Sequence, residues 1–139
     1  TNRLIAHALT LGYEAVPAEV IERGKELFLD FLAVAMGGHQ VAESTRPIIC
    51  GVQELAFRAQ GSCTVLGEQD LYPPHYAALL NGTLAHSMDF DDTHRQSIMH
   101  TGAALFGTLL ALAEERTSSG REFLAATVVG FDIANKVCP

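Results

Sequence analysis

The chain has 139 residues, of which 48% are hydrophobic and 18% charged, and its 9 Lys and Arg against 16 Asp and Glu give a formal net charge of −7. This apolar content excludes a disordered chain, and the length suits one hydrophobic core, so residues 1–139 are predicted to form a single helical domain. The acidic balance and the scattered basic residues argue against a protein that binds nucleic acid through its phosphates.

Cysteine usage and the N-terminus indicate the cellular compartment. Cys50, Cys63 and Cys138 are odd in number and far apart, which favours neither a disulfide framework nor a zinc site. The N-terminus lacks the basic-then-apolar layout of a signal peptide. The longest nearly apolar run, 103–113, is about half of the roughly 20 residues that a membrane helix needs. We therefore expect a cytoplasmic protein with no membrane partner.

The first strong helical pattern follows Pro17, with apolar residues at steps of three and four over 20–35. The pair Gly37-Gly38 is predicted to end this helix. A second helix is predicted over 44–58. Its inward residues are expected to be Ile48, Val52, Leu55 and Ala56.

The second half of the chain is also predicted to be helical. Residues 62–66 form at most one short strand or extended link. Three further helices are predicted over 73–85, 103–115 and 122–137. Ser119 and Glu122 have the spacing of a capping box at the start of the last helix. The predicted fold class is therefore all-α, a bundle of several helices.

Residues 81–102 contain three of the six histidines and three of the sixteen acidic residues. If the third helix continues through this window, His86, Asp89 and Thr93 lie on one face, and Asp91 points elsewhere. The clustered carboxylates repel one another unless cations stand near, and imidazoles beside carboxylates are what general acid–base chemistry requires. The nearby residues that could supply positive charge are His86, His94, Arg95 and His100.

Other interpretations of this window remain open. An acidic cluster at a helix end can be a solvated face or a cap for the next helix. Histidine and aspartate at helical spacing can also hold a divalent cation. The string Asp-x-Asp-Asp-Thr over 89–93 looks like the acid motif of class II terpene cyclases, which are rich in Trp, whereas this chain has none. His7, His39 and His75 have no acidic companions and are expected to be structural or exposed. Gly82 and Gly102 are expected to allow close approach of helices.

The string over 81–94 reads Asn-Gly-Thr-Leu-Ala-His-Ser-Met-Asp-Phe-Asp-Asp-Thr-His. With its flanks, it closely resembles the MmgE/PrpD family of 2-methylcitrate dehydratases and cis-aconitate decarboxylases. The resemblance spans essentially the whole chain. The flanking matches include Tyr13-Glu14, Leu29-Asp30-Phe31, Val65-Leu66-Gly67, His100-Thr101-Gly102 and Gly130-Phe131-Asp132.

The resemblance implies a large all-helical domain, of which this chain is the N-terminal part, and a smaller α+β lid domain. It also implies a homodimer that acts on a small polycarboxylate and needs no metal or other cofactor. The family's active-site Asp, Thr and His fall on Asp89, Thr93 and His100. His86, His94 and Arg95 are candidate partners of the substrate carboxylates.

We therefore expect part of a lyase that dehydrates or decarboxylates a substrate like 2-methylcitrate by acid–base chemistry. An epimerase of the same family fits the motif equally well, because proton abstraction beside a carboxylate begins several of these reactions. A non-catalytic module that dimerises through 103–113 is the alternative from another class. The family commonly has His-Pro-Gly at 100–102, where this chain has Thr101. Its further active-site Lys, His and Tyr lie beyond Pro139, so the resemblance predicts little activity for this chain alone.

Overall fold

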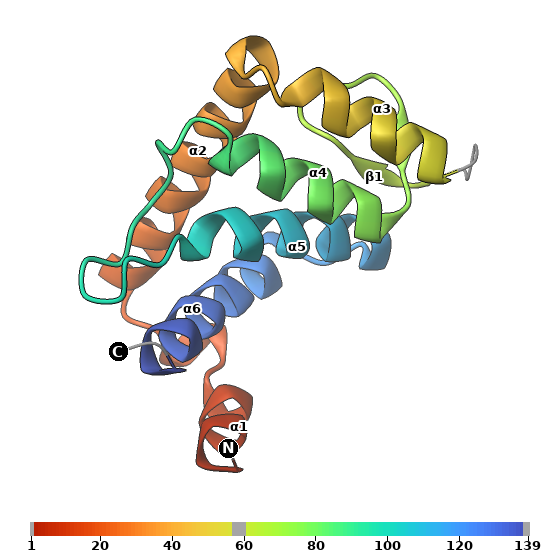
Figure 1. Cartoon of the computed structure of the whole chain (residues 1–139). Coiled ribbons are helices and arrows are strands. Elements are labelled where there is room, and N and C mark those ends of the chain that lie inside the picture. The colour runs from red at the N-terminus through yellow and green to blue at the C-terminus, as the bar shows by residue number, and fades with distance from the viewer. Residues whose placement is uncertain (1, 57–60, 138–139) are drawn as a thin grey trace.

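The computed structural model describes residues 2–56 and 61–137, and in these residues it is built from six α-helices with very little strand (Figure 1). The all-α prediction is confirmed. The helices are α1 (Asn2–Thr10), α2 (Ala18–Val41), α3 (Thr45–Ala56), α4 (Pro74–His86), α5 (Thr101–Arg116) and α6 (Gly120–Val137), with a 3-10 turn, η1, at Tyr13–Ala15. Strands β1 (Cys63–Thr64) and β2 (Leu71–Tyr72) pair antiparallel. The sequence pattern indicated neither α1 nor β2.

The long helix α2 passes through Gly37-Gly38, so the prediction that this pair ends it is wrong. The reason is packing. A Cβ atom at Gly38 would collide with the backbone of Leu84, and one at Gly37 would lie 2.8 Å from the end of the Met88 side chain. The two glycines therefore let α4 and the residues after it lie directly on α2.

Helices α4 and α5 run side by side through similar close contacts (Figure 1). A Cβ at Gly82 would lie 3.0 Å from the Ala103 carbonyl oxygen, and one at Gly107 would lie 2.8 Å from the Ala78 carbonyl oxygen. The expectation that Gly82 permits close helix approach is confirmed. Because Ala103 and Gly107 are buried in this contact, much of the small-residue helix is already used inside the chain.

Aromatic rings fill the space between α2, α5 and α6. The Phe28 and Phe123 rings meet edge to face with centroids 4.7 Å apart, and Phe106, which is 1% exposed, lies 5.3 Å from Phe28 and 5.5 Å from Phe31. Such pairs contribute about 0.5–1.5 kcal/mol beyond the area that they bury. They fix the relative positions of the helices that carry and flank the candidate site.

Helix α3 packs against α2 and α4, its Gln53 donates a hydrogen bond to the Tyr72 hydroxyl at 3.0 Å, and its inward face differs in part from the prediction. Ile49 and Val52 are buried, Ile48 is only partly buried, and Leu55 is 72% exposed. Of the predicted range 44–58, residues 57 and 58 lie outside the described residues. Behind α3, the fully buried Asn81 of α4 accepts a hydrogen bond from the Leu66 backbone N–H and donates one to the Thr64 carbonyl, at 2.8 Å each.

Two histidines that lack acidic neighbours in the sequence acquire them through the fold. His7 Nε2 lies 2.6 Å from Asp132 Oδ2, which connects α1 to α6, and His39 Nε2 lies 2.8 Å from Glu68 Oε1. The His75 and Tyr76 rings lie 4.2 Å apart between centroids and are tilted by 45°. The prediction of structural roles for the first two fits these contacts, but the premise that they have no acidic companions is wrong.

The capping box before α6 is confirmed. The Ser119 backbone N–H donates to the Glu122 carboxylate at 2.7 Å, and the Glu122 N–H donates to the Ser119 hydroxyl at 3.3 Å. The hydrogen bonds that the Ser119 N–H and hydroxyl donate to the Glu122 carboxylate lower the pKa of that carboxyl.

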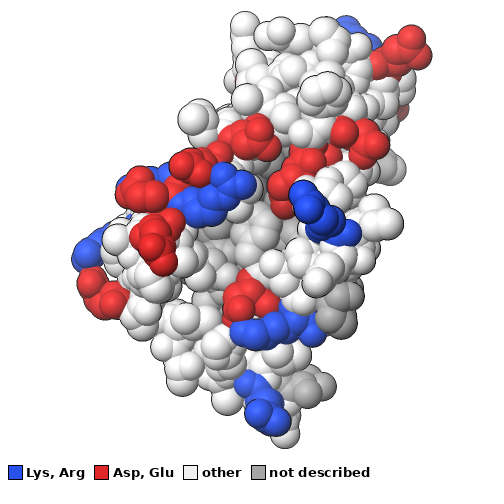
Figure 2. Space-filling view, turned by 90° about the vertical axis from the view of Figure 1, so that its left-hand side faces the viewer, with Lys and Arg blue, Asp and Glu red and all other residues white. Residues whose placement is uncertain are grey.

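The surface and the helix lengths bear on possible partners. On the face that Figure 2 shows, acidic side chains lie next to basic ones rather than beside a continuous basic patch. In the part of the chain that the structure describes, no helix combines the length and the apolar character needed to cross a bilayer.

Candidate active site

The segment over 87–100 leaves helical geometry as soon as α4 ends at His86. The interpretation in which the helix continues through Asp89 and Thr93 is therefore wrong. Asp89 and Ile98 both adopt a left-handed backbone conformation, with φ of 55° and 53°, and His94 pairs with Met99 across an isolated bridge. In Figure 1 this segment lies beside α2 before it enters α5.

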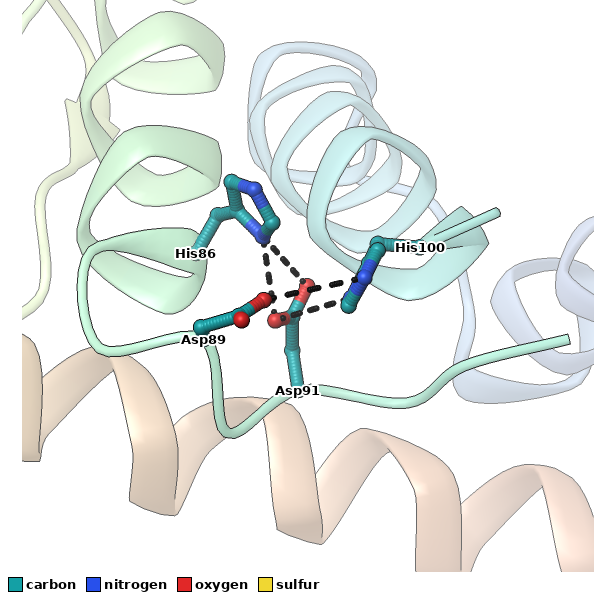
Figure 3. Close-up of side chains that lie close together, drawn as sticks. All are labelled: His86, Asp89, Asp91 and His100. Atoms are coloured by element: carbon teal, nitrogen blue, oxygen red, sulfur yellow. Dashed lines mark hydrogen bonds and ion pairs between the residues drawn. The ribbon is translucent and has the colours of Figure 1, made fainter. Parts of the chain in front are cut away.

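Four titratable side chains meet where α4 ends and α5 begins (Figure 3). His86 comes from the last residue of α4 and His100 from the N-cap of α5, while Asp89 and Asp91 come from the intervening loop. His86 Nδ1 lies 3.1 Å from Asp91 Oδ1, and His100 Nδ1 lies 3.2 Å from the same oxygen. His100 Nε2 lies 3.7 Å from Asp89 Oδ1. The fold thus brings Asp89 and His100 together, as the site prediction requires.

The two aspartates of this cluster differ sharply in exposure. The Asp91 side chain is 3% exposed, whereas that of Asp89 is 79% exposed. The expectation that Asp91 points elsewhere is wrong, because the chain turns after His86 and directs Asp91 under both imidazoles. Helical periodicity could not reveal this contact. The only signal for it in the sequence is the density of His and Asp in the window.

His86 and His100 line a pocket of about 680 Å³ between α4 and α5. Small residues form the opposite walls, among them Gly82, Ala103 and Ala104. An imidazole at the edge of an apolar pocket can donate a hydrogen bond to a bound acid or accept one from it. The cluster therefore borders a space in which a small substrate could be held.

Thr93 is neither part of the cluster of four side chains nor a lining residue of this pocket. Its hydroxyl lies 3.5 Å from the Asp91 carbonyl oxygen, and it lines a second cavity of about 520 Å³, on the α2 and α6 side of the loop. A catalytic role for Thr93 therefore stays a prediction that this arrangement does not support directly.

The neighbouring carboxylate Asp92 has a structural contact of its own. It accepts a hydrogen bond from the Gly102 backbone N–H at 2.9 Å, in the first turn of α5, and also lines the second cavity. Burial raises the pKa of Asp92, while the Gly102 hydrogen bond opposes this shift. Gly102 is required here because a Cβ would collide with the Asp92 carboxylate. The contact fixes the start of α5 and with it the position of His100.

Of the three predicted substrate-binding residues, one belongs to the cluster and two lie outside it. His86 is part of it. His94 bonds through Nδ1 to the Ser97 hydroxyl at 2.7 Å within its own loop and lines the second cavity, and Arg95 is exposed. Substrate contacts from His94 and Arg95 stay predictions.

The cluster also has the composition of a cation site. One ligand atom from each of His86, Asp89, Asp91 and His100 lies within 4.8 Å of all the others. Imidazole nitrogens and carboxylate oxygens together suit Zn²⁺ or Mn²⁺. A metal ion here would be bound by the same imidazole nitrogens and carboxylate oxygens that acid–base chemistry uses.

The family of the chain follows from sequence comparison. The model of the MmgE/PrpD N-terminal domain matches residues 2–139. The chain belongs to the MmgE/PrpD family. It is 33% identical over 129 residues to the cis-aconitate decarboxylase-like protein oryM of Aspergillus oryzae, and the aligned region covers 88% of this chain and 26% of that protein. It is 29% identical over 142 residues to a cis-aconitate decarboxylase of Aspergillus terreus (99% and 28%). It is 33% identical over 138 residues to the cis-aconitate decarboxylase of Homo sapiens (94% and 27%).

The chain therefore spans about a quarter of the length of the curated relatives that it matches. The family assignment matches it to the N-terminal domain of MmgE/PrpD proteins, and the described residues of this chain are mainly helical. The lyase names of these relatives support the lyase class at the level of the family.

Proposed function

We propose that this chain supplies the helical half of the active site of a cofactor-independent lyase that moves a proton on a small polycarboxylate. The observation that carries the proposal is the pair formed by Asp89 and His100, with 3.7 Å between the carboxylate oxygen and Nε2, beside a pocket that His100 lines. A carboxylate and an imidazole with such different exposure are suited to opposite roles in one proton transfer. The domain assignment of residues 1–139 as one helical unit is part of this proposal.

The chemistry would use the pair as acid and base. In a decarboxylation, the C–C bond to one carboxylate breaks, CO₂ leaves with no added proton, and the electron pair left on carbon takes a proton from His100 or Asp89. In a dehydration, the base removes the proton beside a carboxylate, the electron pair forms the double bond, and the hydroxyl group leaves as water with a proton from the acid. Both reactions need the developing negative charge to be stabilised, which protonated His86 or His100 could do.

The names of the relatives make cis-aconitate the first substrate to test. The family resemblance of the sequence makes 2-methylcitrate the second. Both are small acids with several carboxylates, and an acidic chain of net charge −7 attracts neither at long range. Positively charged residues would have to offset this repulsion for the acid to bind. An epimerase acting on a similar acid remains the alternative within the family, because proton removal beside a carboxylate is common to both.

The test incubates the chain in D₂O with cis-aconitate, 2-methylcitrate, citrate and iminodisuccinate, and follows loss of each acid and entry of deuterium by NMR. Because the chain alone is expected to have little activity, we expect slow turnover or slow deuterium exchange with one of them, and Asp89→Asn should lower that rate by about 10²–10⁴-fold, the usual contribution of a positioned acid or base. The matched control is Asp70→Asn, which changes another exposed aspartate outside the helices.

Equal rates for Asp89→Asn and the unchanged chain would remove Asp89 from the mechanism. If no acid reacts and none shifts the ring signals of His86 or His100, the alternative of a dimerisation module gains support. That module would have to use what α5 leaves exposed, chiefly Ala104, Thr108 and Leu112. The homodimer implied for the family is part of the proposal, and sedimentation at several concentrations tests it.

A further inference from the structure

We propose that Asp91 is a positioning residue that holds the His100 ring with its proton on Nδ1, so that Nε2 is the nitrogen that exchanges protons beside Asp89. The inference rests on the proposed function. Its test measures which ring nitrogen of His100 carries the proton and does not require turnover. It assigns different tasks to two carboxylates that the sequence presents as equivalent members of one acidic cluster.

The first argument is that the two carboxylates lie at opposite nitrogens of one ring. Asp91 Oδ1 is 3.2 Å from Nδ1 of His100, within hydrogen-bond range, and Asp89 Oδ1 is 3.7 Å from Nε2, beyond it (Figure 3). The ring thus has one bonded nitrogen and one that is paired only loosely. A substrate proton can be exchanged at the loosely paired nitrogen without breaking the hydrogen bond at the other.

The second argument comes from donor and acceptor chemistry. An ionised carboxylate only accepts hydrogen bonds, whereas a neutral imidazole donates from one nitrogen and accepts at the other. The tautomer with its proton on Nε2 would place the Nδ1 lone pair against the Asp91 oxygen at 3.2 Å, where both groups are acceptors. The tautomer with its proton on Nδ1 avoids this repulsion. It leaves the Nε2 lone pair directed toward Asp89, where the repulsion is weaker because the carboxylate oxygen is 3.7 Å away and its side chain is 79% exposed to solvent. A carboxylate that orients an imidazole in this way is a recurrent device in proton-transfer sites.

The third argument is the rigidity of Asp91. Its side chain is 3% exposed, and His86 Nδ1 lies within 3.2 Å of both its oxygens. The two imidazoles meet edge to face at 4.8 Å between centroids, so His86 packs against the ring that Asp91 orients. A buried acceptor held from a second side keeps a fixed direction, whereas the largely exposed Asp89 is free to follow a substrate.

The experiment measures ¹⁵N chemical shifts of the histidine rings in the 139-residue chain at about pH 8.5, where an ordinary histidine is neutral. We expect His100 to have its proton almost wholly on Nδ1. In Asp91→Asn the side chain keeps its shape but can also donate, so we expect the form protonated on Nε2 to rise at least tenfold in population. Asp91→Glu restores an acceptor and should restore part of the original tautomer ratio.

Asp89→Asn is the matched control, because it makes the same chemical change at the other nitrogen. The proton should remain on Nδ1 in that variant. A wild-type ring with its proton mainly on Nε2 overturns the proposal without recourse to any variant, and so does a folded Asp91→Asn chain with an unchanged ratio. Failure of the lyase proposal would instead appear as absence of both ring-signal shifts and deuterium exchange with every acid, in a chain whose His100 tautomer is as expected.

Discussion

Two irregular segments flank α4, and each is held by a buried polar side chain with a different kind of partner. The segment before α4, over 61–73, is bonded through its backbone, since Asn81 joins the Leu66 N–H and the Thr64 carbonyl. The segment after it, over 87–100, is bonded through side chains, since Asp91 contacts two imidazoles at the edge of a pocket. A polar group that only satisfies backbone atoms maintains the fold, whereas one that bonds titratable rings can also influence chemistry.

The largest expected effect on stability is at Asn81. Replacing Asn81 by Ala leaves one backbone N–H and one carbonyl without partners in the interior, and we expect the free energy of unfolding to fall by about 2–5 kcal/mol. Urea unfolding followed by circular dichroism measures it. Gln69→Ala, at an exposed position in the same segment, should change stability by less than about 0.5 kcal/mol. A similar loss for both variants would contradict the view that Asn81 holds this segment.

The next largest effect is expected at the close contact between α2 and α4, which lies just before the segment over 87–100. Gly38→Ala places a methyl group against the Leu84 backbone, so we expect a loss of about 1–3 kcal/mol as α2 and α4 separate. Gly51→Ala is the control. Nothing lies within 4 Å of a Cβ there, and we expect a gain of about 0.5–1 kcal/mol from helix propensity. If both variants change stability in the same direction, helix propensity rather than close packing determines the result.

The smallest effect is a pH dependence at Asp92. Burial raises the pKa of its carboxyl above the ordinary value of 3.8. The folded chain therefore keeps this proton at pH values where the unfolded chain has lost it, so the free energy of unfolding falls as pH rises from the ordinary to the raised pKa. Asp92→Asn should remove that fall while retaining an acceptor for the Gly102 N–H. Unfolding between about pH 4 and 7 tests this, with Asp70→Asn as control, and a fall that persists in Asp92→Asn would assign it to another group.

The sequence predicted the fold best where periodicity and local chemistry agree. The helix after Pro73, the helix over 103–115 and the capping box of Ser119 and Glu122 all depend on neighbours within one or two turns, and all are present. The prediction was wrong at Gly37-Gly38 because these glycines make room for Met88 and Leu84, which are distant in sequence. For the same reason the pairing of β2 with β1 could not be read from the local pattern.

For the candidate site, the family motif pointed to a window in which the fold brings Asp89, His100 and His86 together. What the pattern could not provide is the path of the loop. Extending α4 by its own periodicity directs Asp91 away and groups Thr93 with Asp89, whereas the turn after His86 has the opposite result. A helix end depends on tertiary contacts such as that between Met88 and Gly37, and these contacts are not visible in a single sequence.

The left-handed backbone at Asp89 restricts which amino acids evolution or an engineer can place there. Asp, Asn and Gly tolerate such a φ, while a β-branched or longer side chain at this position adds conformational strain of about 1–2 kcal/mol to any loss of chemistry. Glutamate, usually regarded as the conservative exchange for aspartate, is therefore a poor one here. A survey of natural variants at this position should find the acid replaced mainly by its amide or by glycine.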